Sequence, residues 1–199
     1  MKKVVLIGLF LSLPGSFASA QSPVNPAPQF TIDVPESRIE FYVGSSVGDV
    51  NGVFKSWKGQ FNVASPGNPE TATLSLVISG RSMTTGGGVK DRIIKGKDFF
   101  YVQKFPTVSF NSTKAIPSND PKKFQLQGEL TLRGVTKPVT LQVSLDRYGK
   151  GNGQIYADLS FDRREFGMTH NALFVRVRDS VRVRMDLDIV QEQAASAKQ

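Results

Sequence analysis

Apolar and polar side chains alternate along much of this chain, so that every second residue is apolar over stretches of seven to nine residues. The alternation is clearest in residues 181–189, where valine, methionine, leucine and isoleucine alternate with arginine and aspartate. It recurs in residues 73–79, 124–132, 138–146 and 155–161. Successive side chains of a strand point to opposite faces, so this pattern predicts antiparallel strands, each with one wet and one dry face.

Turn-forming residues separate these segments at intervals typical of hairpins. They cluster at 66–69, 118–121 and 149–153, and Asp179-Ser180 gives a fourth signal. One segment, 89–101, looks helical, and only briefly. Six to nine strands must either form two packed sheets or close into a barrel, which has no exposed edges. The pattern alone predicts an all-β protein and leaves sandwich and barrel open.

The N-terminal segment has the order of a secretory signal peptide. Lys2 and Lys3 precede an apolar run at 4–13, and the small-residue triplet Ala18-Ser19-Ala20 follows. The run is too short to span a bilayer. We therefore expect residues 1–20 to be removed and the protein to reach the periplasm or the medium. The rest divides into a proline-rich flexible leader (21–28), one domain (29–190) and a polar tail (191–199).

Composition excludes several kinds of chemistry. The chain has no cysteine, so it has neither disulfides nor thiol nucleophiles, and His170 is its single histidine, which leaves zinc and copper poorly supplied with ligands. We therefore predict no metal site. Lysine and arginine number 25 against 17 acidic residues, a net charge of +8. An exported protein without aromatic residues among its basic ones is a poor candidate for binding nucleic acid.

Two motifs admit both a functional and a structural interpretation. Residues 44–48 match G-x-S-x-G around Ser46, but a nucleophile elbow requires a strand-turn-helix in a mostly parallel sheet, which this pattern lacks. We expect no catalytic residues and no enzyme. Arg176, Arg178, Arg182 and Arg184 would share the outer face of a hairpin turning near residues 179–180. They form either a solvated face or a weak contact with anionic lipid headgroups.

Fourteen phenylalanines make the expected interior rich in bulky, purely apolar rings. Such rings fill an ordinary packed core, or they line a cavity for a hydrophobic ligand. Composition favours the packed core and does not exclude the cavity.

Four elements, in order along the chain, resemble the motifs of the YceI family, the bacterial polyisoprenoid-binding-like proteins. Residues 51–61 look like its early G-x-F…G-x-F element. Residues 91–100 and 104–110 look like its central signature, an acid-basic helical turn with D-F-F followed by a K-[FY]-P-x-[IV]-x-F strand. Residues 128–139 are close to its G-x-L-T-[IL]-x-G-V-T-K-P-V hairpin, in which Gly134 can take the positive φ of a tight turn. Arg164-Glu165-Phe166-Gly167-Met168 is similar to its R-x-[DE]-F-G-M element.

The resemblance implies an extended, lipocalin-like antiparallel β-barrel of about eight strands with one short helical segment. Its apolar interior would hold a long-chain isoprenoid lipid, an isoprenoid quinone or a similar amphiphile, with no other cofactor. The alternative is a periplasmic stress-response or interaction module with a packed barrel and no dedicated ligand. The oligomeric state stays open, a dimer included. The side chains expected to line or support the cavity are Phe41, Phe54, Phe61, Leu74, Leu76, Ile78, Phe99, Phe100, Phe110, Leu130, Leu132, Leu141, Val143, Phe161, Phe166, Met168, Val183 and Met185.

The signal sequence yields a first prediction. Cleavage should follow Ala20, because Ala18 and Ala20 supply the small residues that the cleavage site requires. Mass spectrometry of the exported protein should therefore give a chain that begins at Gln21. Mature protein recovered from the cytoplasm with Met1 still attached would contradict the assignment.

Overall fold

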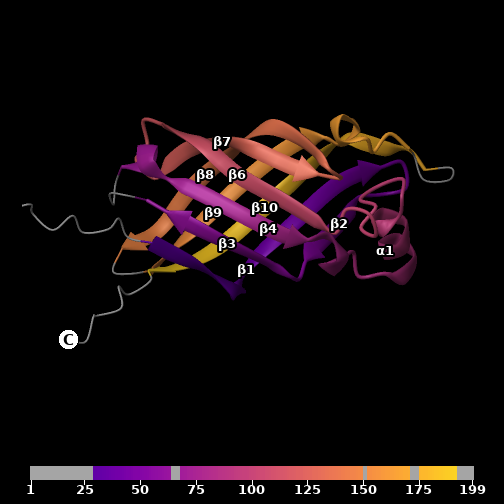
Figure 1. Cartoon of the computed structure of the whole chain (residues 1–199), viewed down its shortest axis with the longest axis horizontal. Helices are drawn as coiled ribbons and strands as arrows, with labels where there is room; N and C mark the ends of the chain where they lie inside the picture. The colour runs from indigo at the N-terminus through magenta and orange to yellow at the C-terminus, as the bar shows by residue number, and fades with distance from the viewer. Residues whose placement is uncertain (1–28, 64–67, 150–151, 171–174, 192–199) are drawn as a thin grey trace, which may run out of the picture.

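The computed structural model describes residues 29–63, 68–149, 152–170 and 175–191, and within them strands dominate (Figure 1). One α-helix and three short 3-10 turns accompany the strands. The strands are β1 (Gln29–Ser45), β2 (Val50–Phe54), β3 (Trp57–Asn62), β4 (Thr73–Ser79), β5 (Met83–Thr84), β6 (Thr107–Pro117), β7 (Lys123–Leu132), β8 (Val135–Gly149), β9 (Asn152–Asp162) and β10 (Val177–Gln191). The helical elements are η1 (Pro69–Thr71), η2 (Gly80–Ser82), α1 (Gly88–Lys95) and η3 (Arg163–Phe166).

Eight of the strands close into an antiparallel barrel. The order runs β1-β3-β4-β6-β7-β8-β9-β10, and β10 returns to pair with β1. Consecutive strands from β6 to β10 are direct neighbours, with β6–β7, β7–β8, β8–β9 and β9–β10 all antiparallel. The predicted antiparallel barrel of about eight strands with one short helix is confirmed, and the sandwich is excluded.

A β-bulge in β1 lies on the seam where the barrel closes. Asp33 pairs with Asp188 and Arg38 with Asp186, so four residues of β1 stand against one residue of β10. The Ser37 hydroxyl bridges this irregularity, because it donates to the Asp33 carbonyl (2.6 Å) and accepts from the Asp188 amide (2.8 Å). Pro35 lies within the bulge, where a strand tolerates the loss of a ladder donor.

The strand β1 has two successive neighbours along its other edge. Its first residues, 29–31, pair with β3, and residues 39–43 pair with β2. Residues 55–56 interrupt the extended chain between β2 and β3, and the 3-10 turn η2 interrupts it between β4 and β5. Beyond these breaks β2 and β5 continue as a short ribbon at the end of the barrel that carries α1 (Figure 1).

One predicted turn is wrong. Asp179 and Ser180 lie inside β10, where Ser180 pairs with Asp162 of β9. Asp179 makes no turn there, because its carboxylate forms an ion pair with the buried guanidinium of Arg163 (3.1 Å). By contrast, the signal at 118–121 does connect β6 to β7, and the Arg133-Gly134 turn connects β7 to β8 with positive φ at both residues (54° and 74°).

Large and small residues alternate across neighbouring strands of the interior. The Phe41 ring covers Gly52, its register partner on β2, so that a Cβ at Gly52 would overlap the ring. The Phe110 ring covers Gly128 in the same way, with a ring carbon 2.6 Å from the position of a Cβ. Part of the abundant phenylalanine is thus explained by rings that fill the space left by glycines in adjacent strands.

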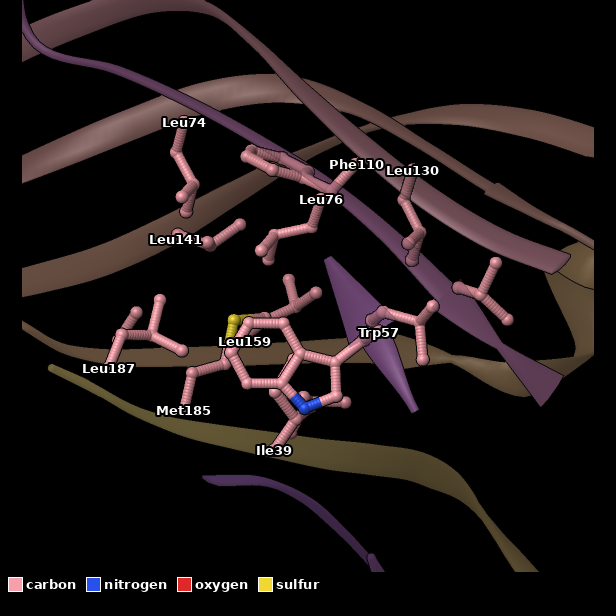
Figure 2. Close-up of a cluster of buried hydrophobic side chains, with 14 of the residues drawn as sticks. Ile39, Trp57, Leu74, Leu76, Phe110, Leu130, Leu141, Leu159, Met185 and Leu187 are labelled. Atoms are coloured by element: carbon pink, nitrogen blue, oxygen red, sulfur yellow. The ribbon is translucent and has the colours of Figure 1, made fainter. Parts of the chain in front are cut away.

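The middle of the barrel is densely filled (Figure 2). The indole of Trp57 lies among aliphatic side chains that come from strands on all sides. The labelled members of this cluster are Ile39, Leu74, Leu76, Phe110, Leu130, Leu141, Leu159, Met185 and Leu187, all buried.

The glycine–phenylalanine packing gives a second prediction. Gly128→Ala should destabilise the fold by about 1–3 kcal/mol, because the new methyl group meets both the Phe110 ring and the Asn111 carbonyl. Gly88→Ala is the control, since Gly88 is the first residue of α1 and nothing lies within 4 Å of its Cβ position. Urea unfolding measures both, and equal stability of the two variants would refute the packing argument.

Candidate functional site: an apolar cavity beneath helix α1

A cavity of about 160 Å³ lies at the end of the barrel that carries α1. The ends of β1, β2, β9 and β10 form its walls, and α1 with the turn after it forms its cover. Its surface is almost wholly apolar. The lining residues are Phe41, Val43, Ser45, Val47, Val50, Lys90, Ile93, Ile94, Phe99, Phe100, Phe161, Arg163, Met168, Val175, Val177 and Val181.

A second cavity, of about 40 Å³, lies between the first cavity and the packed middle of the barrel. The two share Phe41, Phe100, Phe161 and Val181 as lining residues. The Phe100 ring packs against Phe41 and Phe54, with centroid distances of 5.9 and 6.2 Å. Phe100 therefore belongs to the wall between the cavities.

The cover is fastened at the start of α1 by Asp91. Its carboxylate accepts from the Thr84 hydroxyl (2.8 Å) and from the backbone amide and hydroxyl of Thr85 (2.6 and 2.7 Å). These bonds, the amide of Thr85 first, hold the pKa of Asp91 below its ordinary value. Because the folded pKa is lowered, this contribution to stability is complete above the ordinary pKa and disappears as the pH falls through the lowered one.

The cover is fastened at its other end by apolar packing and by Arg133. Ile94, Phe99 and Val102 are buried in the core. Arg133, held in the tight turn between β7 and β8, donates from Nη1 to the Phe99 carbonyl (2.5 Å). Partial burial lowers the pKa of Arg133, while the nearby Asp98 carboxylate acts in the opposite direction.

Arg163 organises the segment that leads into β10. Among the described residues it is the one charged side chain that is buried, 3% exposed. Its Nη1 donates to the carbonyls of Met168 and His170, its Nε to the carbonyl of Arg178, and its Nη2 to the Val177 carbonyl. Nη2 also forms an ion pair with the Asp179 carboxylate (3.1 Å). Four carbonyls and one carboxylate thus engage the guanidinium, so Arg163 lines the cavity while its polar group binds the protein itself.

The side chains predicted to line a cavity divide into three groups. Five line the larger cavity: Phe41, Phe99, Phe100, Phe161 and Met168. Eight more line the smaller one: Phe54, Leu76, Ile78, Phe110, Leu130, Leu132, Val183 and Met185. Five line neither and are buried in the core: Phe61, Leu74, Leu141, Val143 and Phe166.

Sequence reasoning missed the valines and both isoleucines of the larger cavity. Val43 continues the inward alternation of Ile39 and Phe41, and Val181 continues that of Val183, so period-two reading could have found them. The sequence analysis also placed the arginine of the R-x-[DE]-F-G-M element at Arg164, one residue too late. The arginine three residues before Phe166 is Arg163. Arg164 is exposed and makes a longer contact with Asp179 (3.4 Å).

Ser46 of the G-x-S-x-G match has a structural contact in the fold. Ser46 is followed by a turn and β2 rather than by a helix, and its hydroxyl accepts from the Arg176 amide (3.1 Å).

His170 Nδ1 lies 3.8 Å from a carboxylate oxygen of Asp98. In the part of the chain that the structure describes, no cluster of three or more histidine, cysteine, aspartate or glutamate side chains could hold a metal ion. Over the same residues, no helix is both long enough and apolar enough to cross a membrane.

Comparison with known families identifies the family of this chain. The profile of the YceI-like domain matches residues 30–189, which span every strand of the barrel. The chain belongs to the YceI-like domain family. Its relatives include UPF0312 proteins of Pseudomonas syringae pv. syringae (strain B728a), 35% identical, and of Yersinia pestis (strain Pestoides F), 38% identical. Each alignment covers 101 residues, 51% of this chain and about half of the relative's length (52% and 50%).

Solved structures share the YceI-like barrel. Burkholderia cenocepacia BcnA superimposes with a TM-score of 0.71 at 21% identity, over 79% of this chain and 98% of that one. The Campylobacter jejuni YCEI protein gives 0.63 at 24% identity, over 72% and 85%. A domain of Saccharophagus degradans described as polyisoprenoid binding and implicated in plant cell wall breakdown gives 0.62 at 14% identity, over 82% and 98%. At these identities the likeness establishes the fold.

The buried guanidinium of Arg163 gives a third prediction. Arg163→Ala should lower the free energy of unfolding by about 3 kcal/mol, because four buried or half-buried carbonyls lose their donor at once. Arg164→Ala, which removes an exposed partner of the same aspartate, should cost less than about 1 kcal/mol. Chemical denaturation measures the free energy of unfolding of both variants. A loss below about 1 kcal/mol for Arg163→Ala would show that the segment leading into β10 does not depend on the guanidinium.

Proposed function

We propose that this protein is an exported binding or carrier protein for a long-chain isoprenoid or similar amphiphilic lipid, isoprenoid quinones included. The observation that carries the proposal is the apolar cavity at the α1 end of a YceI-like barrel. The description of the Saccharophagus degradans neighbour as a polyisoprenoid binding domain supports the choice of ligand class. The N-terminal residues 1–20 support export and fall outside the described residues.

The chemistry of the cavity favours an apolar chain over a polar group. Its polar side chains are Ser45, Lys90 and Arg163. Arg163 donates to backbone carbonyls and forms an ion pair with Asp179, and Lys90 is exposed on α1. An amphiphile would therefore enter tail first and leave its polar group at the rim, near Lys90. Such a site binds its ligand without transforming it.

The size of the cavity requires the cover to move. Ligand pockets usually measure about 300–1,000 Å³, and this one has about half the lower value. Displacing Phe100 would join the two cavities along the barrel axis, since both share its ring as a wall. Gly86 and Gly87 precede α1 and Gly88 is its first residue, and nothing lies within 4 Å of the Cβ positions of the three. The bonds of Asp91 to Thr84 and Thr85, rather than side-chain packing, therefore restrain the cover at this end.

A second candidate function is an interaction or stress-response module with a packed barrel. The observation that favours it is the middle of the barrel, where Trp57 and its aliphatic neighbours leave little space (Figure 2). The two functions differ in what the larger cavity does. A ligand site gains stability when an apolar chain enters, whereas a packed module gains none.

The fourth prediction tests the ligand site directly. Isoprenoid alcohols and quinones, titrated into protein freed of lipid by organic extraction, should raise the melting temperature. The gain corresponds to about 2.7 kcal/mol at a hundredfold the dissociation constant. Val43→Trp should abolish the shift while leaving the fold intact, because the indole would occupy the cavity that Val43 lines.

Val77→Trp is the matched control, since Val77 faces solvent on β4 and lines neither cavity. It should keep the wild-type shift. If no amphiphile raises the melting temperature of wild type and no lipid is found by mass spectrometry in natively purified protein, the ligand proposal fails. The packed module would then be the better account.

A further inference from the structure

The rim of the larger cavity exposes apolar side chains. Val47, in the turn after β1, is 74% exposed, and Val89 and Ile93 on α1 are 69% and 43% exposed. Val47 and Ile93 also line the cavity. Val89 and Ile93 are four residues apart and therefore share one face of α1. An apolar surface open to solvent is thus continuous with the apolar interior.

The same end of the barrel carries the protein's surplus of positive charge. The segments that contribute to it are 46–49, 81–104, 133–134, 162–170 and 175–179. They contain eleven basic and six acidic side chains, a surplus of five. Residues 21–199 have a net charge of +6, so the remainder of the expected mature chain is nearly neutral.

Several of the acidic groups at this end are already engaged. Asp91 accepts three hydrogen bonds from Thr84 and Thr85, and Asp179 pairs with Arg163 and Arg164. Lys90 and Arg92 are exposed on α1 beside the apolar stripe. The rim is therefore an apolar patch with exposed cations beside it.

We propose that this rim docks onto the surface of an anionic phospholipid bilayer, with Val47, Val89 and Ile93 at the boundary between headgroups and acyl chains. Lys90 and Arg92 would bind lipid phosphates there. The chemistry is that of an interfacial amphipathic helix, in which apolar burial and attraction to anionic lipid act together. A bilayer fits better than an acidic protein, because the exposed apolar residues continue directly into an apolar cavity. An apolar chain could pass between the two without crossing water.

This surface differs from the one expected from the arginines of the last strand. Arg182 is paired with Asp158 (2.7 Å), and the Arg184 guanidinium lies 5.8 Å from the centre of the Tyr42 ring, so both are engaged on the barrel wall. Arg176 and Arg178 belong to the rim. Arg178, Arg182 and Arg184 belong to β10 and Arg176 directly precedes it, without the predicted hairpin turn at 179–180.

Vesicle binding tests the docking. Wild type should sediment with phosphatidylcholine vesicles that contain one-third phosphatidylglycerol, but not with pure phosphatidylcholine, and should be released as salt rises above about 0.1 M. Lys90→Glu with Arg92→Glu should weaken binding at least about 25-fold, since each basic contact contributes about fivefold. Lys114→Glu with Lys122→Glu changes the net charge equally on exposed residues outside the rim and should stay within about threefold of wild type.

A tryptophan at position 89 reports the apolar contact. Val89 does not line the cavity, so Val89→Trp should leave ligand binding unchanged. The fluorescence of this variant should shift to the blue on anionic vesicles and be quenched by lipids brominated in their acyl chains, whereas that of Val77→Trp should not. Equal losses in both charge-reversal pairs, equal binding to neutral vesicles, or a Val89→Trp signal that brominated lipids leave unquenched would each overturn the docking proposal.

The docking proposal gives the proposed ligand site its lipid source, and the two can fail separately. Vesicle binding measured without any added isoprenoid tests the rim alone. Thermal shifts measured without vesicles test the cavity alone. A protein that shows the shift but ignores anionic vesicles would refute docking and leave the carrier function standing.

Discussion

The pairing of β1 with β10 closes the sheet, and the rest of the structure depends on it. The two strands come from opposite ends of the domain, and their ladder runs from Phe30 opposite Gln191 to Ser45 opposite Val177. Continuity across the bulge is kept by Ser37, whose hydroxyl serves both strands at once. Bulges bend a strand and increase its twist. The bend lets β1 meet β3 with its first residues and β2 with its later ones.

Closure creates an interior that different residues fill at different depths. In the middle, Trp57 and its neighbours leave little unoccupied space. Toward α1 the strands supply mostly valines, and the volume that these smaller side chains leave is closed by Phe99 and Phe100 from outside the sheet. The cover is held by polar contacts at both of its ends, Asp91 with two threonines and Arg133 with the Phe99 carbonyl. The cavity is therefore a property of the cover as much as of the barrel.

The alternation of residues gave the strands and their inward faces, because that information is local. Closure was predicted from the resemblance, since no local pattern shows that β1 pairs with a strand about 150 residues away. The alternation also does not predict how far along the barrel axis an inward side chain lies. Leu141 and Val181 both point inward, yet Leu141 is packed in the core and Val181 lines both cavities. Only the position of α1 and Phe100 distinguishes them.

The wrong turn at Asp179 has the same origin. Aspartate and serine favour turns when their side chains bond to the local backbone. Here the carboxylate of Asp179 bonds to a guanidinium that lies 16 positions earlier in the chain. That guanidinium is buried, contrary to the usual fate of arginine, and nothing in the sequence around Arg163 reveals that four carbonyls surround it. A tertiary contact overrode the local preference.

The packing of Phe41 against Gly52 couples two positions that have different tasks. Phe41 lines both cavities, whereas Gly52 lines neither and only leaves room for the ring. A larger residue at position 52 would require a smaller residue at position 41 and a small shift of the Thr84 carbonyl, 3.1 Å from the Cβ position. The smaller residue at position 41 would enlarge the cavity. The volume of the cavity could thus change in evolution through a compensating pair of substitutions that begins on β2, at a residue that lines neither cavity.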